Sequence, residues 1–290
     1  MRRLLAALLA VCAVIGVTIA GAQQRSQEPS QAEDGTQIQA LPAPDGALPR
    51  APARLAATFA ATTRRLRGAL RRWDGDGAVP REVTLLALHH QRILRLAARR
   101  RALGDAMLAR LPRGVRGEAR DSVLGQRHIA AIPRPGRPPR VRVSTAAPAR
   151  ELRGHYAAAQ RRFGIHWSIL ASINFVESAF GKIRSASEAG ARGPMQFMPA
   201  TWRAYGMGGD IDDPRDAILA AANYLRRSGA ARDIDRALFA YNHSTSYVRG
   251  IRRFARRMRA DERAFLTYYA WQVYVRTPSG VRRVTGPGRG

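Results

Sequence analysis

The sequence predicts a mainly α-helical protein, in which an arginine-rich helical segment over residues 54–132 precedes a second helical domain over residues 150–275. Apolar residues recur three or four positions apart through both regions, which is the spacing of one face of a helix. Asp, Pro and Gly lie where these patterns start and stop, as helix caps do. The 290 residues, 46% of them hydrophobic, are enough for one or two domains with a buried core.

The N-terminus has the features of an exported protein. Arg2 and Arg3 precede an uncharged apolar stretch that ends in Ala20-Gly21-Ala22. This order indicates a signal peptide over residues 1–22, or an uncleaved N-terminal anchor of nearly membrane-spanning length. Either alternative places the protein outside the cytoplasm, on the cell-wall side of the cytoplasmic membrane. Cys12, the only cysteine, lies in the apolar stretch, so no disulfide is expected.

Positive charge is concentrated in the first helical region. The formal net charge is +28, and residues 51–150 hold 22 arginines against 6 acidic residues. Such a region suits electrostatic contact with anionic wall polymers or a membrane surface. Binding to nucleic acid is not expected, because the chain is exported and residues 51–150 have no interleaved aromatic platform.

Two helices are expected in the arginine-rich segment. One runs over residues 55–72, and the other opens at Pro80 and continues to about Leu111. Together they suggest a helical hairpin. Residues 23–53 are rich in Gln, Pro, Ala and Ser and predict a flexible linker, while residues 133–149, rich in Pro and Arg, predict an extended connection.

The second domain is expected to hold a dense series of helices. Asp213-Pro214 is a strong start signal, with Asp as the N-cap and Pro at the first helical position. A basic tail over residues 276–290 is expected to be loose, because it consists largely of Gly, Pro and Arg. The predicted helices lie at residues 151–163, 166–180, 201–205, 213–228, 233–241 and 246–258, with a helix or extended segment at 261–275.

Glu177 is the strongest candidate for acid catalysis. It lies at the edge of the apolar stripe that Ile169, Ile173 and Val176 form on their helix. Partial desolvation there raises the pKa of a carboxyl group, which then holds a proton near neutral pH as a general acid must. A surface glutamate at a helix end is the alternative.

The other polar candidates have structural interpretations as well. Ser178 lacks the Gly-x-Ser-x-Gly elbow of a serine hydrolase, so a structural hydroxyl is expected. Asp210, Asp212 and Asp213 are expected in caps and turns, with a cation site or a second catalytic carboxylate as the alternative. Gln196 suits either turn packing or a hydrogen bond to an acetamido substituent.

The motifs together resemble a known family more closely than any does alone. Glu177-Ser178, the stretch GPMQFMPATW at residues 193–202, ANYL at 222–225 and AYN at 240–242 follow one another as in the catalytic domain of the soluble lytic transglycosylases. The resemblance covers about residues 156–257. It implies a lysozyme-like α-helical catalytic domain that cleaves the glycan strands of peptidoglycan.

The resemblance also implies roles for individual residues. Glu177 matches the family's single catalytic acid/base, and Tyr241 matches the tyrosine that orients it. Asn242 completes the tyrosine motif. Met195 and Gln196 match residues that line the saccharide cleft.

A substrate-binding loop serine is implied too, and Ser187 fits its place better than Ser185. The reaction implied is cleavage of the β-1,4 bond between N-acetylmuramic acid and N-acetylglucosamine with formation of a 1,6-anhydro product, without metal or cofactor. A hydrolytic muramidase and a non-catalytic cell-wall-binding protein are the alternatives.

Overall fold

The computed structural model describes residues 40–133, 141–277 and 280–288. Ala40–Gly290 form one compact unit. The expected signal peptide or anchor at residues 1–22, and residues 23–39 of the expected linker, lie outside the described residues. The mainly helical fold class is confirmed, since eleven helices and one two-stranded sheet make up the regular structure of the described chain.

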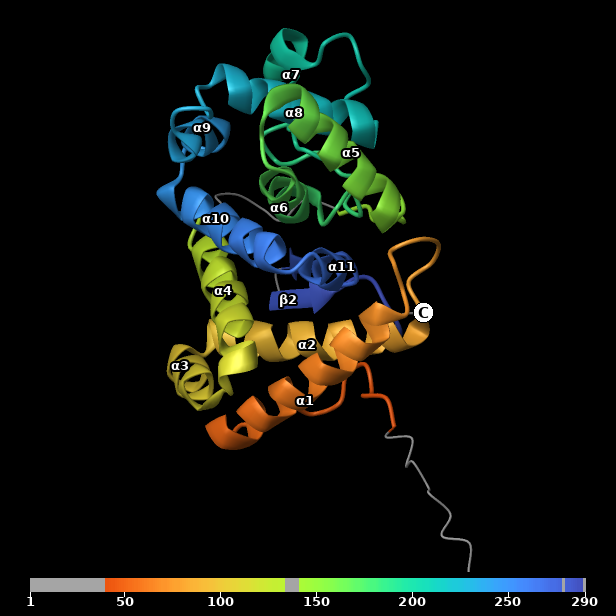
Figure 1. Ribbon diagram of the computed structural model, residues 1–290, viewed down its shortest axis with the longest axis vertical. Helices are drawn as coiled ribbons and strands as arrows, with labels where there is room; N and C mark the ends of the chain where they lie inside the picture. The colour runs from red at the N-terminus through yellow and green to blue at the C-terminus, as the bar shows by residue number, and fades with distance from the viewer. Residues whose placement is uncertain (1–39, 134–140, 278–279, 289–290) are drawn as a thin grey trace, which may run out of the picture. The chain divides into compact units, whose positions relative to one another are not determined.

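The arginine-rich segment contains four helices: α1 (Pro52–Arg71), α2 (Arg81–Arg99), α3 (Arg101–Arg110) and α4 (Arg113–Ala130). The expected two-helix hairpin is therefore wrong (Figure 1). The helix that begins after Pro80 breaks at Arg100, where ψ is 85°. Arg127 of α4 stabilises this break by donating to the carbonyl oxygens of Ala97 at 3.1 Å and Ala98 at 3.4 Å. Both lie in the last turn of α2, where carbonyls have no partner within the helix.

Seven further helices follow: α5 (Ala149–Phe163), α6 (Trp167–Ser178), α7 (Pro199–Tyr205), α8 (Pro214–Arg227), α9 (Ile234–Tyr241), α10 (Thr245–Ala260) and α11 (Arg263–Tyr269). Asp213 caps α8 as predicted, its Oδ1 accepting the N–H of Asp216 at 2.9 Å. Asp233 caps α9 in the same way. Helix α6 packs against α5, α8 and α10 and so lies at the centre of these helices (Figure 1).

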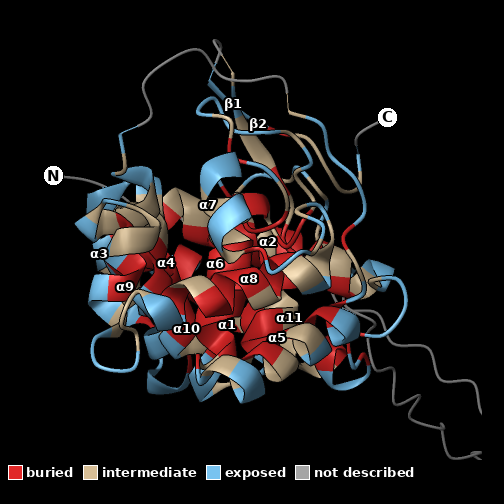
Figure 2. Cartoon of the chain, turned by 90° about the horizontal axis from the view of Figure 1, so that it is seen from above, coloured by how far each residue is buried: buried red, intermediate tan, exposed pale blue. Residues whose placement is uncertain are grey.

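The two helical regions share one hydrophobic core. Helix α4 packs along α10, and buried residues of both regions belong to a single cluster. Figure 2 shows these buried residues where the helices pack against one another, with exposed residues around them. Among the described residues, none of the helices combines the length and the apolar character needed to cross a membrane.

The basic tail is not loose where the structure describes it. Strands β1 (Tyr274–Thr277) and β2 (Gly280–Arg283) pair antiparallel, with Tyr274 opposite Arg283. The linker expectation also fails for residues 40–51, where Leu41 and Leu48 pack against the core. Residues 40–51 and the β1–β2 hairpin are joined by the Arg283–Asp45 ion pair at 2.9 Å.

Candidate active site

Glu177 lies in the last turn of α6, half-buried. Its Oε1 accepts a hydrogen bond of 2.7 Å from the hydroxyl of Tyr247. The helix ends directly afterwards, with Ala179 and Phe180 in the left-handed region at φ 52° and 65°. Phe180 is 1% exposed, so its burial fixes this turn and with it the position of the Glu177 backbone.

Tyr247 is held in the first turn of α10. Its ring is buried, and its backbone N–H donates to Oγ of Ser244, the N-cap of the helix, at 3.3 Å. Burial, and next the charge of Glu177, raise the pKa of the Tyr247 hydroxyl well above its ordinary value. The hydroxyl therefore keeps its proton and remains a donor to the carboxylate.

Tyr241 is the residue that the resemblance implies orients Glu177, and this role stays a prediction. Its hydroxyl donates to the carbonyl oxygen of Met195 at 2.7 Å. The ring lies parallel to that of Tyr247, with centroids 6.4 Å apart, and burial, followed by the charge of Glu177, raises the pKa of Tyr241 as well. Tyr241 thus lies near the Glu177 carboxylate and holds the loop over residues 193–197, which contains Met195.

Ser178 ties α6 to that loop. Its Oγ is buried, donates to the carbonyl oxygen of Pro194 at 2.5 Å and accepts the N–H of Gly181 at 2.8 Å. This is the structural role expected of the hydroxyl. Ser178 and Tyr241 therefore bind consecutive carbonyls, those of Pro194 and Met195, and join three sequence motifs through two hydrogen bonds.

The loop itself requires glycine at its first position. Gly193 has φ 74°, and a Cβ there would lie 1.9 Å from the carbonyl oxygen of Ile211. Arg192 and Phe197 close the loop by exchanging backbone hydrogen bonds of 2.8 and 2.9 Å. Gln196 also has positive φ, 51°, and its Nε2 donates to the Gly193 carbonyl at 3.0 Å.

Met195 differs from its expected role. Its side chain is 0% exposed, so in this structure it packs beneath the loop and lines no open surface. The physical reason is that an apolar side chain gains from burial, and the tight turn after Gly193 directs it inward.

The remaining predicted site residues make local contacts. Oγ of Ser187 accepts the N–H of Ala191 at 3.0 Å, and Oγ of Ser185 accepts that of Arg142 at 2.6 Å. Asn242 is the C-cap of α9. Contact of any of these side chains with a substrate stays a prediction.

The three clustered aspartates serve the structure around α8. Asp210 accepts the N–H of Asp212 at 2.9 Å, Asp213 caps the helix, and Asp212 pairs with Arg192 at 2.9 Å. In the described parts of the chain, no group of three or more His, Cys, Asp or Glu side chains is arranged to hold a metal ion.

Lys182, the only lysine of the sequence, fixes the turn behind Glu177. Its Nζ donates to the carbonyl oxygens of Tyr269 and Trp271. Burial lowers its pKa to about 8. A compact ammonium group with three donors suits this enclosed position, and it connects the end of α6 to the end of α11.

Aromatic rings support the tyrosine pair from behind. The Tyr224 ring lies 5.5 Å from that of Tyr241 and 4.9 Å from that of Tyr205, both edge to face. Phe197 packs against Tyr241 at 5.9 Å. Because edge-to-face aromatic pairs are stabilising, the contacts with Tyr224 and Phe197 help to hold the Tyr241 ring in place.

Comparison with known proteins gives two matches. The family model described as "Transglycosylase SLT domain" matches residues 155–264. A curated relative, "Membrane-bound lytic murein transglycosylase F" of Thiobacillus denitrificans (strain ATCC 25259 / T1), is 34% identical over an alignment of 119 residues that covers 38% of this chain. The chain covers 25% of that relative's length. No solved structure matches the chain.

Proposed function

We propose that this chain, which carries a lysozyme-like domain of the SLT type over residues 155–264, is a peptidoglycan lytic transglycosylase. The observation that carries the proposal is the single half-buried carboxyl group of Glu177, which accepts a hydrogen bond from Tyr247 and stands on a turn tied to the Gly193–Phe197 loop through Ser178. One carboxyl group, held in this way, can give up a proton and take another back.

The reaction proposed uses Glu177 twice. Glu177 first protonates the oxygen that links N-acetylmuramic acid to N-acetylglucosamine, and the C1–O bond breaks while the acetamido group of the substrate stabilises the cation. The carboxylate then takes the proton of the muramic C6 hydroxyl, whose oxygen bonds to C1 and closes the 1,6-anhydro ring. The intramolecular attack gains from proximity and requires no second carboxylate as nucleophile or base.

A hydrolytic muramidase is the competing proposal. Such an enzyme generally uses a second carboxylate, either as the base that activates water or as the nucleophile. The three candidate aspartates are engaged elsewhere, Asp210 and Asp213 with backbone N–H groups and Asp212 with Arg192. This engagement favours the transglycosylase.

The proposed substrate lies on the cell-wall side of the cytoplasmic membrane. The relative's name describes a membrane-bound protein, and the N-terminal pattern of this chain predicts export by a cleaved signal or an anchor. We therefore propose that the protein acts outside the cytoplasm on glycan strands.

The variant Glu177→Gln tests the catalytic assignment. It keeps the size of the side chain and a carbonyl oxygen that accepts from Tyr247, but it has no acidic proton to transfer. Because general acid–base groups contribute about 100- to 10,000-fold to rate, release of soluble fragments from purified sacculi should fall by at least about 100-fold. Glu188→Gln, on an exposed loop, is the matched control and should keep full activity. Undiminished activity of Glu177→Gln would contradict the assignment.

A further inference from the structure

Four arginines form a stripe along one side of α10, the helix that carries Tyr247 in its first turn. Residues three, four and seven positions apart lie on the same side of a helix. The α10 stripe is defined by this spacing and consists of Arg249, Arg252, Arg253 and Arg256. From its first to its last residue it extends about 10 Å along the helix axis.

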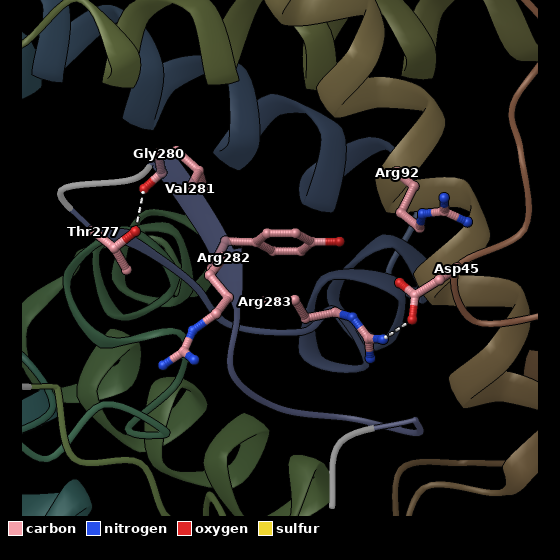
Figure 3. Close-up of a pocket in the computed structure, with 8 residues that line it drawn as sticks. Asp45, Arg92, Thr277, Gly280, Val281, Arg282 and Arg283 are labelled. Carbon is pink, nitrogen blue, oxygen red and sulfur yellow. Dashed lines mark hydrogen bonds and ion pairs between the residues drawn. The ribbon is translucent and has the colours of Figure 1, made fainter.

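The guanidinium groups of the α10 stripe are open to solvent. The side chains of Arg252 and Arg256 are 53% and 59% exposed, and Arg249 is exposed as well. The arginines beside the β1–β2 hairpin differ, because Arg283 is only 3% exposed and is paired with Asp45 (Figure 3). A ligand can therefore reach the α10 stripe without any rearrangement of the fold.

The α10 stripe carries more positive charge than its partners neutralise. Asp121 of α4 accepts from Arg253 at 3.1 Å and from Arg256 at 2.9 Å. Asp235 of α9 pairs with Arg252 at 3.3 Å. Four guanidinium groups thus face two carboxylates, and the surface keeps a net positive charge.

The remaining arginine of the stripe, Arg249, has no carboxylate partner among the described residues. It lies close to His128 of α4, since burial, and next the charges of Arg249 and Arg253, lower the pKa of that ring. The positive potential therefore extends over the surface where α4 packs along α10 (Figure 1). Such a potential attracts anions.

The α10 stripe faces away from the candidate active site. Tyr247 donates to Glu177, whereas Arg249, two residues later, lies roughly 200° further round the helix. A ligand on the stripe therefore leaves Glu177 and its neighbours free.

The shape and chemistry of the stripe indicate its partner. A row of guanidinium groups suits a chain with repeated anionic oxygens, because arginine forks bind phosphate and carboxylate groups. Helices that enter a membrane surface present Trp, Phe or Leu, and none of the exposed large hydrophobic residues of the described chain lies on α4 or α10. The aromatic residues of α10, Tyr247 and Phe254, are buried, so the stripe offers no ring for the stacking that single-stranded nucleic acids use.

We propose that the α10 stripe binds a linear anionic polymer of the cell wall through its phosphate or carboxylate groups. The cell wall as the source of the polymer rests on the proposed function, whereas the exposure and charge of the stripe do not. Asp121 fixes Arg253 and Arg256, which reduces the loss of side-chain freedom on binding. Binding at the stripe would hold the enzyme beside its glycan substrate.

Fluorescence anisotropy of a labelled polymer, titrated with the full chain, tests the proposal. The probes are poly(glycerol phosphate) and poly-L-glutamate, which contain no glycan. The double variant Arg249→Gln/Arg252→Gln should weaken binding about 10-fold, because two exposed charge contacts are lost. Asp235→Asn should strengthen binding several-fold, because it removes a carboxylate that competes for Arg252.

Matched controls make the same changes of charge elsewhere on the surface. Arg54→Gln/Arg64→Gln, on α1, and Glu188→Gln, on a loop, alter exposed positions and should leave the affinity unchanged. Thermal unfolding of each variant checks folding. Should the double variant on α10 unfold, Arg249→Gln alone, which breaks no ion pair, should still weaken binding.

Absence of binding to both polymers, or equal weakening by the two double variants, would overturn the proposal. Binding to phosphatidylglycerol vesicles but to neither polymer would also overturn it, since a lipid surface would then be the partner. Tighter binding of poly(glycerol phosphate) identifies phosphate as the group recognised, and tighter binding of poly-L-glutamate identifies carboxylate.

The same experiment separates the α10 stripe from the proposed function. Glu177→Gln should bind both polymers as tightly as the wild type does. A wild-type protein that binds through Arg249 and Arg252 but cleaves no glycan would contradict the proposed function and leave the binding surface standing.

Discussion

Tyr247 and Tyr241 make different contacts at the candidate site. Tyr247 contacts the carboxyl group of Glu177, whereas Tyr241 contacts the Met195 carbonyl and so holds the Gly193–Phe197 loop. The sequence motif led to Tyr241, because Ala-Tyr-Asn is a recognisable unit. A local signal for Tyr247 exists in Ser244, since a serine N-cap places the residue three positions later in the first helical turn. What that turn faces depends on the packing of α10 against α6, which spacing does not reveal.

Tyr247→Phe should lower the rate of glycan cleavage by about 10- to 100-fold. A hydrogen bond to a charged group contributes about 1.5–3 kcal/mol, and each 1.4 kcal/mol of barrier is about tenfold in rate. Turnover of purified sacculi measures the effect. Tyr241→Phe is the matched control: it removes a hydroxyl from a parallel ring but leaves the donor to Glu177, so the rate of cleavage should fall less. A larger fall in rate in Tyr241→Phe than in Tyr247→Phe would contradict the role given to Tyr247.

At the scale of the elements, the contact between α4 and α10 determines where α10, the helix that carries Tyr247, lies. Asp121 of α4 is 8% exposed and accepts from Arg253 at 3.1 Å and from Arg256 at 2.9 Å. Gly125 lets the two helices approach, because a Cβ there would lie 2.8 Å from the ring of Phe254. The arginine-rich segment therefore supports the helix that carries Tyr247.

Gly125→Ala should destabilise the protein by about 1–3 kcal/mol, the usual cost of overpacking a core. The added methyl group meets the Phe254 ring, which is itself buried against Phe175 and Tyr268. Gly117→Ala is the control in the same helix: it is exposed with open space around it, so the gain in helix propensity should stabilise by about 0.5–1 kcal/mol. Chemical denaturation measures both. Equal effects of the two substitutions would show that the contact between α4 and α10 is not tight at Gly125.

The elements differ in how far they could be predicted. The starts of α8 and α9 were predictable, because Asp213 and Asp233 bond to backbone groups two or three residues away. The break at Arg100 was not, since Arg127, from a different helix, binds the carbonyls that the end of α2 leaves unpaired. The β1–β2 hairpin was also missed, because arginine and glycine obscure the alternation of a strand and the buried Arg283 depends on Asp45.

At the scale of the whole molecule, His90 joins the first helices to the end of the domain. Its ring is 4% exposed and packs between Phe59, at 5.0 Å, and Trp271, at 6.0 Å. Burial, and after it the charges of Arg257, His89 and Arg67, lower its pKa from 6.5 to about 3. Between pH 6.5 and about 3 the ring is therefore neutral in the folded protein, whereas it is protonated in the unfolded chain.

The protein should lose stability as the pH falls from 6.5 towards 3. In this window the unfolded state binds more protons at His90 than the folded state does, so the loss approaches about 1.4 kcal/mol per pH unit. His90→Leu should flatten this dependence, whereas His155→Gln, in a helix-surface pair with Glu151, should not. Denaturant midpoints measured at several pH values test whether stability falls with falling pH. If His90→Leu shows the same dependence of stability on pH as the wild type, His90 is not its source and the prediction is contradicted.

The identity of the glycan product tests the proposed function most directly. Purified sacculi are digested by the protein in heavy-oxygen water, and the released muropeptides are analysed by mass spectrometry. Because Glu177 passes the proton of the C6 hydroxyl and no water enters, we predict 1,6-anhydro ends that lack one water and carry no heavy oxygen. Reducing ends that carry heavy oxygen, with no anhydro species, would contradict the account and identify a hydrolytic muramidase.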